Sequence, residues 1–334
     1  MTGLRPQYPI ATERLLLRPH RPDDLEDLLA FHGDPDVVRY LPWPVRDREA
    51  TAAALRPKLA QGVLTEPGQW LVLAVELRET ASVIGEVLLK WAGDEHRQGE
   101  LGFAFGRAHH GRGLAAEAAA EMLRLGFDEL GLHRITAVCI AENTASARLL
   151  ERLGFDLEGR LGDTIHVKGQ WRTQLLYALR EEDWRAGATA AADLAEIRDL
   201  VHTFFEAFTS DERVAERLAD LPSVLLPEAR IVRTCGGEPV SYDVASFIAP
   251  RQTLLTDGSL RDFSERADGG RIDLFGDVAH WFGRYSKNGV LAGADYRGSG
   301  MKSLQFVRTS AGWRISAAAW DDARDGVDRH RAGS

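Results

Sequence analysis

The sequence predicts two domains, an α/β domain in its first half and an α+β domain in its second half. Strand-like and helix-like patterns alternate as far as residue 184, and after a short stretch of small residues helical patterns give way to a run of strands. A length of 334 residues is also sufficient for two domains. We therefore expect domains at 1–184 and 194–334, joined by a linker at 185–193.

The elements expected in the first half are defined by the period of their apolar residues. Alternation predicts strands at 12–18, 70–77, 83–91, 100–105, 133–140, 155–161 and 173–179. Helical spacing and helix-start residues predict helices at 22–31 and 49–64, one from Ala115 onward, and one from Asn143 to Leu153. Asn143 is suited to cap the last of these helices, and Gly154 to end it.

A glycine-containing turn (residues 110–115, the glycine turn) is the feature around which the first half is organised. It follows the strand at 100–105 and opens the helix that begins at Ala115. Such a turn presents unpaired backbone N–H groups, and the helix dipole adds positive potential. Arg107 and Arg112 add permanent positive charge. The residues alone therefore predict an anion site, and neither the phosphate-loop pattern nor the dinucleotide fingerprint is present.

Several short motifs occur in a specific order along residues 8–184. They are Thr12-Glu13-Arg14-Leu15, Ile84-Gly85, residues 111–118, residues 142–146, Leu153-Gly154-Phe155 and the closing stretch 171–184. Together they resemble the RimJ/RimL branch of the GNAT N-acetyltransferase superfamily. The resemblance implies a mixed sheet with helices on both faces, which splays between its fourth and fifth strands and holds acetyl-CoA in the opening. It also implies direct transfer of the acetyl group to an amine, without a metal.

The resemblance also assigns residues to acetyl-CoA binding. In the family a Gln/Arg-x-x-Gly-x-Gly/Ala turn cradles the CoA pyrophosphate, and here His110 replaces the Gln or Arg while Gly113 and Ala115 hold the last positions. The residues expected to bind acetyl-CoA are Phe103, Ala104, Phe105, Arg107, His110, Gly111, Arg112, Gly113, Leu114, Ala115 and Asn143. Helix capping accounts for Asn143 equally well.

Acetyl transfer needs a base for the amine, a donor for the oxyanion and an acid for the leaving thiolate. Glu100 is the leading candidate base, since this branch often carries a catalytic carboxylate on that strand, and Glu86 is the next. The competing interpretation of Glu100 is a solvated acid at a strand edge. The usual family tyrosine position holds Leu150, so Ser146 is the candidate acid, with helix-start hydrogen bonding as its alternative role.

The acceptor amine is expected to meet the loops around residues 31–43 and 162–172. Trp43, Glu86 and Trp171 are the candidate substrate-binding residues, with packing as the alternative role of the tryptophans. The resemblance suggests a protein N-terminal amine, while an aminoglycoside, a polyamine or another small amine stays open.

The second half is expected to form helices and then strands. Helical patterns lie at 193–208, 211–221 and 241–255, and strand patterns at 262–267, 271–275, 278–286, 302–308 and 313–320. With the closing Gly312-Trp313-Arg314-Ile315, this order resembles the nuclear transport factor 2-like, or SnoaL-like, fold. The resemblance implies a cone-shaped, curved antiparallel sheet with N-terminal helices, used for ligand binding or dimerisation. Candidate pocket residues are His280, Tyr285, Arg308, Asp321 and Asp243.

Composition limits the remaining function classes. The net charge of −9 argues against general nucleic-acid or membrane-surface binding, and Cys139 and Cys235, the only cysteines, exclude a disulfide framework. With no membrane-spanning or signal-peptide pattern, we expect a cytoplasmic protein, and a homodimer through the second domain. Two alternatives remain: a CoA-binding sensor without turnover, or a bifunctional protein whose second domain is an isomerase or hydrolase.

Overall fold

The computed structural model describes residues 3–324, and the chain divides between Gly187 and Ala188 into two compact units. We call them unit 1 and unit 2 and describe each by itself. The division falls within helix α6 (Glu181–Glu206), so the residues expected to form a linker at 185–193 are helical. No helix within the described residues is both long and apolar enough to cross a membrane.

Unit 1 is built on an eight-stranded sheet with the order β1-β2-β3-β4-β5-β6-β8-β7. All neighbours run antiparallel except β5 and β6, so the sheet is mixed, as expected. The strands are β1 (Ile10–Ala11), β2 (Leu15–Pro19), β3 (Trp70–Leu77), β4 (Ser82–Gly93), β5 (Gln98–Phe105), β6 (Arg134–Ile140), β7 (Asp156–Val167) and β8 (Gln170–Arg180).

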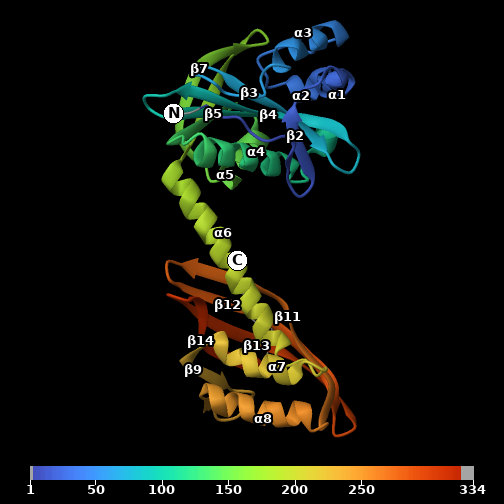
Figure 1. Cartoon of the computed structure of the whole chain (residues 1–334), viewed down its shortest axis with the longest axis vertical. Coiled ribbons are helices and arrows are strands. Elements are labelled where there is room, and N and C mark those ends of the chain that lie inside the picture. Colours follow the sequence, from blue (N-terminus) through green and yellow to red (C-terminus); the bar gives the residue numbers. More distant parts are fainter. Residues whose placement is uncertain (1–2, 325–334) are drawn as a thin grey trace. The chain divides into compact units, whose positions relative to one another are not determined.

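Helices cover both faces of this sheet, with α1 to α3 on one face and α4 and α5 on the other (Figure 1). They are α1 (Leu25–His32), α2 (Pro35–Val38), α3 (Arg48–Lys58), α4 (Leu114–Arg124) and α5 (Thr144–Arg152), with short turns η1 (Pro22–Asp24), η2 (Arg107–His109) and η3 (Leu125–Glu129). Helix α3 is shorter than the expected 49–64, because the chain leaves the helix just after Pro57.

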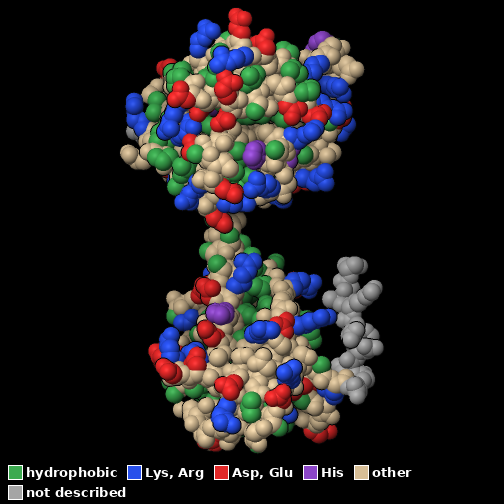
Figure 2. All heavy atoms as spheres, turned by 90° about the vertical axis from the view of Figure 1, so that its right-hand side faces the viewer, with side chains coloured by type: hydrophobic (Ala, Val, Ile, Leu, Met, Phe, Trp, Pro, Cys, Tyr) green, Lys and Arg blue, Asp and Glu red, His purple; other side chains and the backbone are tan. Residues whose placement is uncertain are grey.

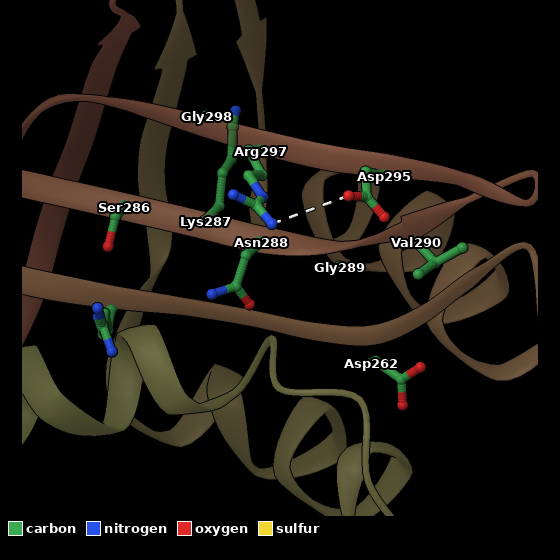
Figure 3. A pocket seen from close by; sticks show the side chains of 10 residues that line it. Asp262, Ser286, Lys287, Asn288, Gly289, Val290, Asp295, Arg297 and Gly298 are labelled. Atoms are coloured by element: carbon green, nitrogen blue, oxygen red, sulfur yellow. Dashed lines mark ion pairs between the residues drawn. The ribbon is translucent and has the colours of Figure 1, made fainter.

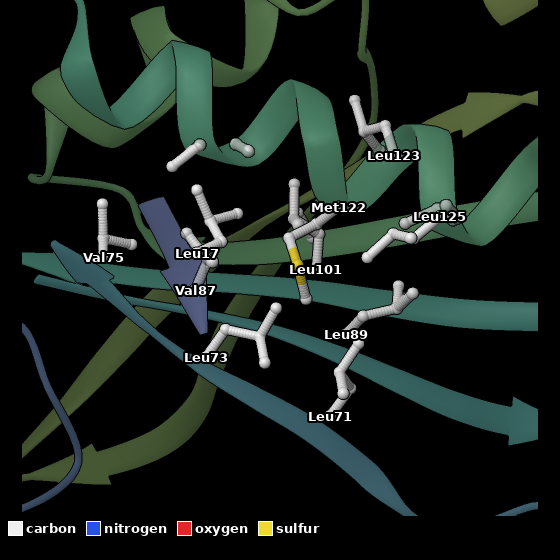
Figure 4. Packing of buried hydrophobic residues seen from close by; sticks show 14 of the residues in the cluster. Leu17, Leu71, Leu73, Val75, Val87, Leu89, Leu101, Met122, Leu123 and Leu125 are labelled. Atoms are coloured by element: carbon white, nitrogen blue, oxygen red, sulfur yellow. The ribbon is translucent and has the colours of Figure 1, made fainter. Parts of the chain in front are cut away.

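The main core of unit 1 lies between the sheet and α4. Figure 4 shows Leu73 and Leu89 of the strands beneath Met122 of the helix, and all three side chains are fully buried. Successive residues of a strand face opposite sides, so Val87 joins this core while Glu86 faces α1 and α3. The strand period therefore places a carboxylate in the layer between the sheet and α1.

Strands β5 and β6 separate soon after they meet. Their parallel pairing is limited to Gln98–Arg134, Gly99–Ile135 and Glu100–Thr136, whereas β5 stays paired with β4 as far as Phe105. Beyond Glu100, one edge of β5 therefore has backbone N–H and C=O groups that no neighbouring strand satisfies. Glu100 lies at the point where the two strands part.

Unit 2 contains a six-stranded sheet with the order β10-β9-β14-β13-β12-β11. Its elements are α7 (Val214–Asp220), η4 (Leu221–Ser223), β9 (Leu225–Arg233), β10 (Val240–Tyr242), α8 (Val244–Thr256), β11 (Leu260–Phe275), β12 (Val278–Leu291), β13 (Ala294–Thr309) and β14 (Gly312–Asp322). Phe204 and Phe205 of α6 and Phe247 of α8 pack in its core against Trp281 and Tyr285 of β12. We call this side of the sheet the inner face.

Unit 2 departs from the expected order in its first strands. The patterns missed β9 and β10, because Pro227 and charged residues interrupt the alternation of β9. These strands precede α8, so the expectation that all helices come first is wrong. A purely antiparallel sheet is also wrong, since β9 runs parallel to β14.

The later part of unit 2 also differs in detail. The two strands expected at 262–267 and 271–275 form one strand, β11, with an irregularity before Gly270. A Cβ at Gly270 would lie 2.4 Å from Trp281 Nε1, so the close approach of the indole requires glycine there. Pro250 lies inside a continuous α8 and does not break it.

A buried ion pair joins β2 to the turn before α1. Arg18 donates from Nη2 and Nη1 to the two carboxylate oxygens of Asp24, at 2.8 and 2.9 Å, and from Nε to Glu76 at 2.7 Å. The side chains of Arg18 and Asp24 are 7% and 5% exposed. Burial alone would raise the pKa of Asp24, but the nearby His20 ring and the hydrogen bonds from Arg18 lower it below its ordinary value.

Replacing Asp24 by Asn is expected to lower the free energy of unfolding by about 3 kcal/mol, because it leaves a buried guanidinium short of charge compensation. The folded pKa of Asp24 is depressed, so this stabilisation is present above the unfolded value of about 4 and is lost as pH falls through the folded pKa. Urea titrations between pH 3 and 7, a window that spans the unfolded value, measure the stability loss in the variant and the onset of the pH-dependent loss. The control is Glu26→Gln, which breaks an exposed pair with Arg48 and should cost under about 1 kcal/mol. Equal losses in the two variants would contradict the prediction.

Candidate functional site

The glycine turn is open and left-handed at two positions. Gly111 and Gly113 have φ of +73° and +79°, which glycine adopts without strain, and no atom lies within 4 Å of a Cβ built at Gly111. Helix α4 begins at the next residue, Leu114, so the N–H groups of its first turn have no intrahelical acceptor. The turn and the helix terminus together form a site suited to a phosphate group.

Arg14 holds the glycine turn in place. Its Nη1 donates to the carbonyl of Arg112 at 2.8 Å, and its Nε donates to Glu117 of α4 at 2.7 Å. The hydroxyl of Thr12 donates to the same carboxylate at 2.6 Å. Burial would raise the pKa of Glu117, but the bonds from Thr12 and Arg14 lower it. The motif at 12–15 is thus a brace for the turn, a role that its sequence did not reveal.

His110, the residue that departs from the family pattern, ties the turn to the end of β5. Its Nε2 lies 2.9 Å from the carbonyl oxygen of Phe105. Because a carbonyl only accepts, Nε2 carries the proton in this bond. Of the neighbouring residues expected to bind acetyl-CoA, Ala104 and Phe105 are buried and Phe103 is half-buried. Beside them, Arg107 is exposed and forms an ion pair with Asp36.

Glu100 is half-buried at the last pair of β5 and β6. The hydroxyl of its partner Thr136 donates to the carbonyl of Gly99 at 3.2 Å, which adds a cross-strand contact at this position. Within residues 3–324 the Glu100 carboxylate makes no hydrogen bond or ion pair, so both oxygens are available. Its position and its lack of partners suit a group that accepts a proton.

Glu86 lies in a buried charged cluster, which we call the Glu86 cluster: Glu86, Lys58, His20, His32 and Arg46. Glu86 is 1% exposed and forms an ion pair with Lys58, while Nε2 of His32 and of His20 lie 3.5 and 3.6 Å from its oxygens. Burial would raise the pKa of Glu86, but His32 and Lys58 outweigh it and lower the pKa to about 2. A buried carboxylate held so firmly in its charged form is a weak base and presents no surface to an acceptor.

Trp43 belongs to the edge of the Glu86 cluster. Nη1 of Arg46 donates to Nδ1 of His32 at 3.1 Å, and the same guanidinium lies 4.7 Å from the centroid of the Trp43 ring. His32 therefore carries its proton on Nε2, the atom that faces Glu86. These residues lie in separate parts of the sequence, so no local motif predicted that they would come together. Trp171, by contrast, is 63% exposed, and its ring centroid lies 5.2 Å from that of His166.

Asn143 caps the N-terminus of α5 with its side chain. Oδ1 of Asn143 accepts a hydrogen bond from the backbone N–H of Ser146 at 3.2 Å. Ser146 is half-buried in the first turn of the helix. Leu150, where the family usually has a tyrosine, is 1% exposed and belongs to the main core.

The polar residues expected to line a pocket in unit 2 lie apart from one another. Asp243 caps α8, Arg308 forms an ion pair with Asp193, and Asp321 forms one with Arg324. By the alternation of β12, His280 and Tyr285 lie on opposite faces of the sheet. Tyr285 alone among the candidates lies in the interior, at 1% exposure.

Comparison with known proteins identifies the family. Residues 14–156 match the acetyltransferase (GNAT) domain. The uncharacterized N-acetyltransferase YnaD of Bacillus subtilis is 31% identical over 175 residues, which cover 52% of this chain and 98% of YnaD. The chain belongs to the GNAT acetyltransferases. It is an acetyl-CoA-dependent N-acetyltransferase, as the family resemblance of the first half implied.

Two relatives of the acetyltransferase have a named acceptor. The [ribosomal protein uS5]-alanine N-acetyltransferase of Escherichia coli is 39% identical over 87 residues, 26% of this chain and 45% of that protein. The spermidine N(1)-acetyltransferase of Escherichia coli is 28% identical over 91 residues, 27% of this chain and 49% of that protein. Relatives of the acetyltransferase thus include one named for an alanine of a ribosomal protein and one named for spermidine.

Glu117→Gln is expected to weaken acetyl-CoA binding about tenfold, since a charge-assisted hydrogen bond contributes about 1.5–3 kcal/mol and its loss frees Arg14 from the turn. Glu117 itself faces Thr12 and Arg14, so the effect acts through the shape of the turn. Calorimetric titration with acetyl-CoA measures it. Glu121→Gln on the same helix, which removes a pair with Arg124, is the matched control and should leave the Kd unchanged. An unchanged Kd in Glu117→Gln would show that the brace does not shape the site.

Proposed function

We propose that unit 1 transfers the acetyl group of acetyl-CoA directly to the α-amine of a protein N-terminus, with Glu100 as the base. The observation that carries this proposal is the unpartnered Glu100 carboxylate at the point where β5 and β6 separate. The same strand ends at Phe105, which His110 ties to the glycine turn. Strand β5 therefore runs from Glu100, the proposed base, to Phe105, which lies next to the turn suited to the pyrophosphate.

The residues divide the chemical work as follows. Glu100 takes a proton from the acceptor ammonium, directly or through a water, and the free amine attacks the thioester carbonyl. Backbone N–H groups on the open edge of β5 stabilise the oxyanion. The C–S bond then breaks, and the attacking nitrogen releases its second proton to water. The thiolate takes a proton from water or from the Ser146 hydroxyl, which regains one from water. Leu150 contributes no proton, because it is an apolar residue of the core.

Glu100→Gln is expected to lower kcat by about 100-fold or more, the usual contribution of a general base, with little change in acetyl-CoA affinity. Thiol release and calorimetry measure the two quantities. Glu66→Gln, at an exposed site, serves as the control. A Glu100→Gln enzyme within a few-fold of the wild-type kcat would leave Glu100 as a solvated strand-edge acid.

The surroundings of Glu100 favour an acceptor with one amine over a polyamine. The adjoining face of β6 and β8 presents Val138, 39% exposed, and the half-buried Leu176, both of them apolar. In the nearby loops, Glu142 forms an ion pair with an arginine and gives no excess negative charge. On the face of unit 1 seen in Figure 2, side chains of both charges are interspersed. A polyamine, which carries several positive charges, would need unpaired carboxylates.

A panel of acceptors tests this choice. A peptide with a free N-terminal alanine is expected to give thiol release with a kcat/KM at least about tenfold above that of spermidine, because one unpaired carboxylate satisfies one amine. The same peptide with a blocked N-terminus should give none. A preference for spermidine would overturn the proposed acceptor and support the small-amine alternative. Acetyl-CoA binding without release for any amine would support the sensor, which the burial of Leu150 favours.

For unit 2 we propose ligand binding or dimerisation in place of a reaction of its own. Its candidate catalytic residues are dispersed, and Arg308 and Asp321 are occupied in ion pairs. Ser303 and His280 do lie at hydrogen-bond distance, with Oγ and Nε2 2.8 Å apart, but no carboxylate among the described residues bonds to His280 to orient it as a base. This dispersion argues against the bifunctional alternative.

A further inference from the structure

A charged cluster lies inside unit 2 among aromatic side chains. Lys302 of β13 is 3% exposed, and its Nζ lies 2.7 Å from the Glu265 carboxylate of β11. Four ring centroids, those of Phe204, Phe205, Tyr285 and Trp320, lie within 5.4 Å of this ammonium. Burial lowers the pKa of Lys302, although Glu265 acts in the opposite direction. Charged groups in such a place carry a desolvation cost that a purely structural core avoids.

Two glycines of β13 make room for the rest of this cluster. Tyr285 and Lys287 of β12 both reach Asp322 of β14, which lies beyond β13, and the Lys287 ammonium is 2.8 Å from it. A Cβ at Gly300 would lie 2.9 Å from the Tyr285 hydroxyl, and a Cβ at Gly298 would lie 2.6 Å from Cε of Lys287. Figure 3 shows the Lys287 side chain extending past Gly298.

Arg251 of α8 has no carboxylate partner among the described residues. Its Nη1 donates to the carbonyl of Phe247 at 2.8 Å, and no acceptor is found for Nε or Nη2. The guanidinium carbon lies 3.9 Å from the ring centroid of Phe247, 5.6 Å from that of Trp320 and 5.7 Å from that of Tyr242. Burial and Arg233 lower the pKa of Arg251, while Tyr242 and Glu265 raise it.

The charges around Arg251 do not cancel. Lys302 is matched by Glu265, and Lys287 by Asp322. An open pocket of about 440 Å³ that Lys287 also borders holds its own pair, Asp295 and Arg297 at 3.8 Å (Figure 3). Arg251 and the neighbouring Arg233 have no such partner among the described residues, and Arg251 is half-buried and so within reach of a small molecule.

We infer that unit 2 binds a small organic carboxylate through Arg251, with the half-buried rings of Tyr242 and Trp320 against the apolar part of the ligand. Two of the three guanidinium nitrogens have no acceptor, and a carboxylate accepts two parallel hydrogen bonds from such a fork. The rings of Tyr242 and Trp320 supply apolar contact beside the charge. This site is independent of acetyl transfer in unit 1.

Calorimetry on the full chain without acetyl-CoA tests the inference, with acetate, benzoate and hexanoate as probes and benzamide as the neutral analogue of benzoate. The variant is Arg251→Gln, and the control is Arg284→Gln, at an exposed arginine of β12. At least one carboxylate is expected to bind saturably to the wild type and to the control. Arg251→Gln should weaken that binding about tenfold or more, the equivalent of one charge-assisted hydrogen bond, and benzamide should not compete.

Several results would overturn the inference. They are no saturable binding of any of the three carboxylates, equal affinity in Arg251→Gln, and benzamide binding as tight as that of benzoate. Arg251→Lys covers the case in which Arg251→Gln does not fold, because it keeps the charge but loses the planar fork. That variant should bind the carboxylate several-fold more weakly than the wild type. Unchanged affinity in Arg251→Lys would also count against the site.

Discussion

The early separation of β5 from β6 is the constraint on which the rest of unit 1 depends. Three residue pairs hold the two strands together, and beyond Glu100 the edge of β5 is open. A strand edge inside a domain is tolerated only where something else satisfies its polar groups. In this acetyltransferase the extended part of a co-substrate is suited to that place. The hydrogen bond from Arg14 to the glycine turn and the hydrogen bond from His110 to the end of β5 then fix the position of the turn next to this strand.

The two units treat buried charge in different ways. In unit 1 the buried Glu86 carboxylate is surrounded by Lys58 and two histidines, so its partners all come from the fold itself. In unit 2 the lysines have matched carboxylates while Arg251 does not. A carboxylate whose partners come from the fold itself stabilises the arrangement of its own elements, whereas a guanidinium with no carboxylate partner is suited to a ligand from outside.

Local sequence patterns predicted the helices and strands of unit 1 closely, but they did not predict its long-range contacts. The strand expected at 70–77 has those bounds in the structure, because its apolar run is uninterrupted. The glycine turn was likewise visible from residue types alone. The partners of Glu86 and Glu117 were not, since Lys58 and Arg14 approach them only through tertiary folding. In unit 2 the strand β9 was missed because Pro227 obscures its alternation, and with it the mixed character of the sheet.

The parallel pair in unit 2 has a consequence for how this chain folds during synthesis. Arg230 of β9 pairs with Ala317 of β14, and the whole of α8, β11, β12 and β13 lies between them in sequence. A ribosome therefore releases β9 long before its partner strand exists. Until β14 emerges, β9 has only the short β10 beside it, and its other edge is open to foreign strands. The high contact order of this pairing makes closure of the sheet a late and slow event.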